Sequence, residues 1–168
     1  MSSKSATLEN SQHVPLPIAK QILAEYHKRL RNEYPGILSG MKVVDIDPTN
    51  RTTTFELQIT QTLLNEFGSL HGGAVCGIID ECTSAVLMAI DKLSFNSLSL
   101  DMSVSFVSGA AKKDDVLVIV GKSTNVSKKF AFAEAAIFKK EADGSKGRLL
   151  AFGKQTKFRF GSGENAKL

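Results

Sequence analysis

The chain has 168 residues, of which 42% are hydrophobic, and carries a formal net charge of +4 at pH 7. These values are typical of one soluble globular domain and exclude a wholly disordered chain. No run of 18 apolar residues and no N-terminal apolar signal segment occurs, so we expect no membrane span and no secretion. The basic residues form no stripe with interleaved aromatic residues, which argues against nucleic-acid binding.

The N-terminal half of the sequence alternates between helical and extended patterns. Residues 1–14 are serine-rich and aperiodic, which predicts a flexible arm, and 15–36 is the expected N-terminal helix, with apolar residues at helical spacing over 18–32. Segments 38–46 and 52–60 flank a turn composition and predict a hairpin. Residues 73–91 then predict a central helix whose small side chains indicate close enclosure by other structure.

The remaining sequence is extended. Segments 97–108, 116–125, 130–140 and 148–160 alternate, and 98–106 does so most strictly, with an apolar residue at every even position. Strands in runs favour an α+β fold, here a curled antiparallel sheet wrapped around the long central helix. No repeat or linker indicates a second domain, so we expect one domain over 37–160 and a flexible tail at 161–168.

Residues 65–80 carry the chemistry. Asn65 precedes the His71-Gly72-Gly73 turn by six residues, and Asp80 follows His71 by nine. A Gly-Gly turn that runs into a helix presents unpaired N–H groups at a positive helix end. Such donors, beside an acid that can activate water, are the minimum equipment for hydrolysing an acyl compound.

These features resemble a known family. The order of elements, the motif above and Ser99-Leu100-Asp101-Met102 are similar to the small hotdog-fold acyl-CoA thioesterases, of the phenylacetate-pathway and thioesterase superfamily member 2 type. The likeness covers about residues 37–160. It implies a hotdog thioesterase domain over that range, hydrolysis of an acyl-CoA to free acid and coenzyme A, and no cofactor besides the coenzyme A of the substrate. It also implies homodimers with shared active sites, assembled into a homotetramer.

The resemblance assigns roles residue by residue. Gly72, through its N–H, and Asn65, through its side-chain amide, would bind the thioester carbonyl. Asp80 would act as general base or nucleophile, supplied by the neighbouring chain, while Ser99 would help to hold the attacking water. His71 is interpreted as bracing the turn so that both glycines present their N–H groups. The expected substrate-binding residues are Gly73, Phe106, Ser108, Gly109, Val126, Ser127, Lys128, Lys129 and Phe130.

Several alternatives stay open for the residues around this motif. Asp80 is also compatible with a structural carboxylate, with Glu81 as the runner-up acid, and Ser99 with a solvent-facing position. Asp101 is expected to share the strand face of Ser99 as a paired structural acid. The side chains of Phe106, Phe130 and Phe132 would belong to the core or line an acyl channel.

Other residues bear on cofactors and function class. Cys76 and Cys82 are interpreted as small buried thiols in a reducing compartment. Three scattered histidines and no Cys/His cluster leave no metal site to expect. Two other functions compete: an enoyl-CoA hydratase or dehydratase using His71 with Asp80, and a non-catalytic acyl-CoA-binding protein.

The last three residues resemble a targeting signal. Ala166-Lys167-Leu168 resembles the carboxy-terminal Ser-Lys-Leu tripeptide that a peroxisomal import receptor reads. We therefore expect a peroxisomal protein, with the cytoplasm as the alternative.

Overall fold

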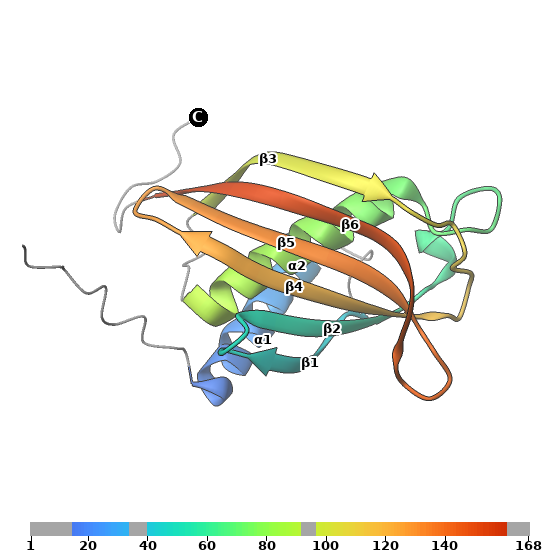
Figure 1. The fold of residues 1–168 in the computed structure, drawn as a ribbon, viewed down its shortest axis with the longest axis horizontal. Helices are drawn as coiled ribbons and strands as arrows, with labels where there is room; N and C mark the ends of the chain where they lie inside the picture. The colour runs from blue at the N-terminus through green and yellow to red at the C-terminus, as the bar shows by residue number, and fades with distance from the viewer. Residues whose placement is uncertain (1–14, 34–39, 92–96, 161–168) are drawn as a thin grey trace, which may run out of the picture.

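A computed structural model describes residues 15–33, 40–91 and 97–160 (Figure 1). The predicted arm, the predicted tail and the C-terminal tripeptide lie outside these ranges. In chain order the elements are α1 (Leu16–Glu33), β1 (Lys42–Asp47), β2 (Thr52–Gln58), the short 3-10 helix η1 (Gln61–Leu63), α2 (Gly72–Asp91), β3 (Ser97–Phe106), β4 (Val116–Val126), β5 (Phe130–Lys140) and β6 (Lys146–Arg159). The predicted helices and strands are confirmed, and their ends differ by a few residues.

The strands form one antiparallel sheet that curls around α2, as the hotdog arrangement predicts (Figure 1). Their order is β1-β2-β4-β5-β6-β3, so β1 and β3 occupy the two edges. The inner face of the sheet packs on α2, while α1 packs on α2 and β1. The outer edge of β3 pairs with no strand of the described ranges.

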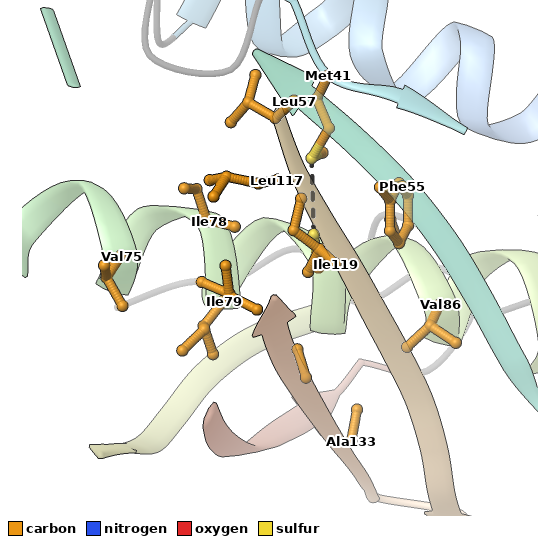
Figure 2. Packing of buried hydrophobic residues seen from close by; sticks show 14 of the residues in the cluster. Met41, Phe55, Leu57, Val75, Ile78, Ile79, Val86, Leu117, Ile119 and Ala133 are labelled. Carbon is orange, nitrogen blue, oxygen red and sulfur yellow. Dashed lines mark hydrogen bonds between the residues drawn. The ribbon is translucent and has the colours of Figure 1, made fainter. Parts of the chain in front are cut away.

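Helix α2 is enclosed by the sheet because small residues let the backbones approach. A Cβ atom added at Gly121 of β4 would lie 3.0 Å from the carbonyl oxygen of Cys82, and one at Gly153 of β6 would lie 3.0 Å from Ile79. By length and composition α2 could cross a membrane, but 72% of its most apolar window is buried inside the protein. It therefore has the character of a core helix, packed as Figure 2 shows.

The two cysteines of α2 differ. Cys82 is buried, with its Sγ 3.6 Å from the Sδ of Met41 (Figure 2). Burial, and then the charge of Glu81, raise the pKa of the Cys82 thiol well above its usual range. Cys76 is only half-buried, which corrects the prediction for that thiol, because it lies on the stripe of α2 that the sheet leaves uncovered.

Strand β3 contains an irregularity that its strict alternation hid. Ser99 pairs with Lys157 of β6 but Asp101 pairs with Thr156, so one extra residue is inserted on β3. The bulge turns Ser99 toward α2 and leaves Asp101 on the outer face. The prediction that the two share a face is therefore wrong, since a bulge reverses the period of two.

The outer face of the sheet is partly aromatic. Phe130 and Phe132 of β5 are 40% and 38% exposed there, so they do not belong to the core of the chain, and the alternative that they line an acyl channel stays a prediction. The reason lies in their neighbours, since the alternate residues Ala131, Ala133 and Ala135 face α2, where the packing admits only small side chains.

Candidate active site

The loop before α2 fixes the orientation of the Asn65 side chain. Its Oδ1 accepts hydrogen bonds from the backbone N–H groups of Phe67 (3.0 Å) and Ser69 (3.1 Å), and Gly68 has the positive φ that so tight a turn requires. Since Oδ1 is held by these donors, Nδ2 must point the other way, where it lies 3.0 Å from the Ser69 hydroxyl. The turn thus presents an amide donor.

His71 caps the helix with its ring. The ring Nδ1 of His71 accepts a hydrogen bond from the backbone N–H of Gly73 at 2.9 Å, and the backbone N–H of His71 donates to the carbonyl of Leu63 at 2.8 Å. The imidazole does brace the turn, but it also occupies the Gly73 N–H, which corrects the expectation that both glycines present theirs. In the described part of the chain, the Gly72 N–H has no acceptor.

A cavity of about 310 Å³ opens beside these donors. Asn65 and Gly72 line it together with Phe106, Ser108 and Gly109, three of the predicted substrate-binding residues. A Cβ atom at Gly72 would lie 3.6 Å from the Phe106 ring, so a side chain there would fill the space between. We call Asn65, His71, Gly72 and this cavity the amide pocket.

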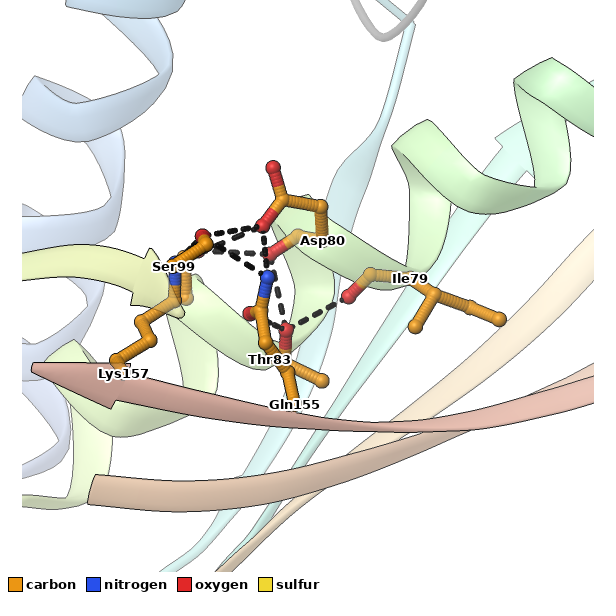
Figure 3. Close-up of polar contacts among 7 residues, drawn as sticks. Ile79, Asp80, Thr83, Ser99, Gln155 and Lys157 are labelled. Carbon is orange, nitrogen blue, oxygen red and sulfur yellow. Dashed lines mark hydrogen bonds and ion pairs between the residues drawn. The ribbon is translucent and has the colours of Figure 1, made fainter. Parts of the chain in front are cut away.

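Asp80 lies farther along α2, within a network of side chains (Figure 3). Its Oδ1 accepts hydrogen bonds from the Ser99 hydroxyl (3.1 Å) and from Gln155 Nε2, and it lies 3.5 Å from the Lys157 ammonium. The Thr83 hydroxyl contacts Gln155 Oε1 and lies within hydrogen-bond distance of the carbonyl oxygens of Ile79 (2.8 Å) and Asp80 (3.0 Å). We call Asp80, Ser99, Gln155 and Lys157 the carboxylate cluster.

The charges of this cluster are unequally exposed. The Lys157 side chain is 6% exposed, and that of Asp80 is 42% exposed. Burial lowers the pKa of Lys157 below its usual range, partly opposed by the charge and hydrogen bonding of Asp80 and by the charge of Glu81. A buried cation therefore faces a carboxylate that solvent or a substrate can reach.

The amide pocket and the carboxylate cluster do not converge within one chain. Gly72 and Asp80 are eight residues apart on one helix, which is about 12 Å along its axis. Asp80 does not line the cavity. One chain therefore holds two half-sites.

The predicted residues 126–130 lie at the other end of β3 from the amide pocket. The Lys129 carbonyl accepts from the backbone N–H of Arg159, which pairs with Ser97 at the start of β3, whereas Phe106 ends that strand. Val126, Ser127, Lys128, Lys129 and Phe130 thus lie toward the carboxylate cluster of their own chain.

Sequence reasoning missed Ser69, Gln155 and Lys157. A signal for the latter two was present, because both sit at alternate positions of β6 with Gly153, on the face turned toward α2. Polar side chains on an inward strand face need partners there.

The residues described in the three ranges contain no group of three or more His, Cys, Asp or Glu side chains that could hold a metal ion. The expectation that no cofactor is needed stays a prediction.

Comparisons with known proteins give a consistent set of relatives. A family model described as the thioesterase superfamily matches residues 67–145. Mouse acyl-coenzyme A thioesterase 13 is 28% identical over 102 residues, which cover 61% of this chain and 69% of the mouse protein.

Solved structures are similar over more of the chain. The crystal structure of zebra fish thioesterase superfamily member 2 has a TM-score of 0.71 at 22% identity and covers 88% of this chain and 99% of its own. That of thioesterase superfamily member 2 from mouse has a TM-score of 0.68 at 25% identity, covering 83% and 96%.

Proposed function

We propose that the chain, which has the hotdog fold and matches the thioesterase superfamily model over residues 67–145, is a member of that superfamily and an acyl-CoA thioesterase. The reaction hydrolyses an acyl-CoA to the free acid and coenzyme A. The low identity to the named relatives leaves the acyl group open, so the argument for this chain rests on its own site.

One observation supports the proposal most strongly. Within one chain the amide pocket has no carboxylate beside it, and the Asp80 carboxylate has no amide pocket beside it. An uncovered edge strand is a template for pairing with another chain, and Leu100, 56% exposed on β3, adds apolar surface to that edge. Antiparallel pairing of two β3 strands about a two-fold axis sets the start of one beside the end of the other. The Ser99 end of one subunit then faces the Phe106 end of its partner, and the half-sites complete each other.

The chemistry follows from that arrangement. The carbonyl oxygen of the thioester accepts from the Gly72 N–H and from Asn65 Nδ2, at the positive end of α2. Asp80 of the partner subunit takes a proton from water as the water oxygen attacks the carbonyl carbon. The tetrahedral oxyanion collapses, the carbon–sulfur bond breaks, and coenzyme A leaves as a thiolate that takes up the proton.

The basic turn suits the nucleotide end of coenzyme A. Lys128 and Lys129 belong to the end of the sheet that carries the carboxylate cluster, so in the proposed dimer they reach the same shared site. Lysine side chains at the mouth of a site are suited to phosphate charges. We propose that these two lysines contact the phosphates, with Ser127 closing the turn between β4 and β5 through Phe130.

Assembly beyond the dimer and localisation are separate proposals. The exposed Phe130, Phe132 and Phe152 on the outer sheet face support the homotetramer, because monomers rarely expose such patches. Import into peroxisomes rests on Ala166-Lys167-Leu168, outside the described residues, and stays a prediction. Deleting these three residues and following the location of the protein tests it.

A thiol-release assay over acyl-CoAs of increasing chain length tests the function. We expect release of free thiol that saturates with substrate and depends on Asp80. Tight binding without thiol release would instead identify a non-catalytic acyl-CoA-binding protein, and hydration of an enoyl-CoA without thiol release would identify a hydratase. The hydratase gains no support from His71, because its Nδ1 accepts the backbone N–H of Gly73.

A further inference from the structure

The Ser99 hydroxyl has no hydrogen-bonding capacity left for a water molecule. A serine hydroxyl can donate one hydrogen bond and accept two. Ser99 Oγ accepts from Lys157 Nζ at 2.9 Å and from Gln155 Nε2 at 3.0 Å, and it donates to Asp80 Oδ1 at 3.1 Å. All three positions are therefore occupied by protein.

The Gln155 amide is used in the same way. Its Nε2 donates one N–H to Asp80 Oδ1 and the other to Ser99 Oγ. Its Oε1 contacts the Thr83 hydroxyl, whose one hydrogen is also within reach of the carbonyl oxygens of Ile79 and Asp80. This amide therefore holds Asp80 and Ser99 at a fixed separation and is itself held from α2.

The two carboxylate oxygens of Asp80 have different surroundings. Ser99, Gln155 and Lys157 all contact the Asp80 carboxylate through its Oδ1, and Figure 3 shows the other carboxylate oxygen directed away from the network. Among the described residues, Oδ2 accepts no hydrogen bond. It is the oxygen that remains for a substrate water.

We propose that Asp80 Oδ2 takes the proton of the attacking water, and that Ser99 is a positioning residue that links Lys157 to Oδ1 through its hydrogen bonds instead of holding that water. This inference rests on the proposed function and revises the role that family resemblance gives to Ser99. Lys157 is likewise a positioning residue, since it touches Asp80 and Ser99 and not the reacting atoms.

Electrostatics explains why a buried lysine is kept there. The charged groups that act on Lys157 are Asp80 and Glu81, both from α2, while β3 and β6 contribute the uncharged Ser99 and Gln155. A cation beside a carboxylate favours its ionised, proton-accepting form.

The test compares pH profiles of kcat/KM for the full-length protein and three variants. In Lys157→Met we expect the acidic limb to move to higher pH, because a carboxylate that loses a neighbouring cation binds a proton more readily. In Ser99→Ala we expect a move in the same direction, because Oδ1 loses the Ser99 O–H donor. KM should stay near the wild-type value. The double variant should shift by less than the sum of the two single shifts, since Lys157 and Ser99 contact each other and the same Asp80 oxygen.

Lys154→Met is the matched control. Lys154 lies on the same strand, β6, but is exposed on the outer face, so the same loss of charge there should leave the limb in place. If Lys157→Met behaves like this control, or if Ser99→Ala loses rate with an unmoved limb, the proposed positioning roles are wrong and Ser99 holds the water. If Lys157→Met does not fold, Ser99→Ala alone decides between these outcomes. Absence of thiol release by the wild-type protein would defeat the proposed function itself, which is a separate result.

Discussion

The two half-sites on α2 are built from contacts of very different range. The hydrogen-bond donors of the amide pocket are positioned within the short segment from Leu63 to Gly73, by a turn and a helix cap, while Phe106, Ser108 and Gly109 complete its cavity. The carboxylate cluster joins residues as far apart as Asp80 and Gln155, on three elements of the fold. The donors of the pocket therefore depend on local backbone geometry, whereas the cluster depends on the register of β3 and β6.

The largest effect should come from the cluster. Asp80→Ala removes the base, and we expect kcat to fall by about 10²–10⁴-fold with acyl-CoA binding retained. Glu81→Gln, a change at the next residue, is the matched control and should keep most of the activity. Thiol release and substrate binding measured on both variants check this, and retention of more than about a tenth of the wild-type rate in Asp80→Ala would contradict the role of a general base.

The pocket can be disabled without disturbing its loop. Asn65→Asp keeps an oxygen to accept from the N–H groups of Phe67 and Ser69 but loses the amide donor. We expect kcat to fall by about 10²–10³-fold, as for other lost oxyanion donors. The thermal unfolding midpoint should stay unchanged, and a variant with normal kcat would exclude Asn65 from carbonyl binding.

A smaller effect should come from the helix cap. His71→Ala removes the acceptor of the Gly73 N–H and should lower the free energy of unfolding by about 1 kcal/mol. His71→Asn offers a capping oxygen in its place and should recover most of that loss. Urea unfolding of both variants measures this, and equal stability of His71→Ala and wild type would show that the ring contributes nothing to the turn.

The smallest effect is a change in the pH dependence of stability. Burial lowers the pKa of Lys157 below 10.5, so between the two values the unfolded chain binds more protons. Stability from this residue therefore rises with pH through that window and is lost as pH falls through the lowered pKa.

The difference in unfolding free energy between wild type and Lys157→Met isolates this contribution. The raised pKa of Cys82 acts in the opposite direction at alkaline pH, but it is common to both proteins and cancels. A difference that stays constant across the window would contradict the burial of a charged Lys157.

The sequence predicted the half of the site that is local. The spacing of Asn65, His71 and Gly72 predicted the turn at the start of the helix. Asp80 was singled out because it is a carboxylate in an otherwise apolar helix. Lys157 and Gln155 were not found, because their partner is more than seventy residues away and only strand register brings them to it. The same limit applied to Ser99, whose orientation depends on a bulge that an alternating pattern conceals.

The fold was predicted more completely than the site because periodicity reports it directly. Alternation located all four C-terminal strands, and the small residues of α2 predicted its enclosure. The errors concerned which face of the sheet a side chain occupies. Phe130 and Phe132 lie on the outer face, because the alanines that alternate with them, and not the larger rings, fit against α2.

Complementation between two inactive variants tests the shared site most directly. Asn65→Asp and Asp80→Ala chains are co-expressed, and thiol release is compared with each variant alone. Random pairing makes half of the dimers mixed, each with one intact site, so the account predicts about a quarter of the wild-type rate. No recovery above the single variants, with mixed dimers demonstrated, would place both groups on one chain and contradict the account.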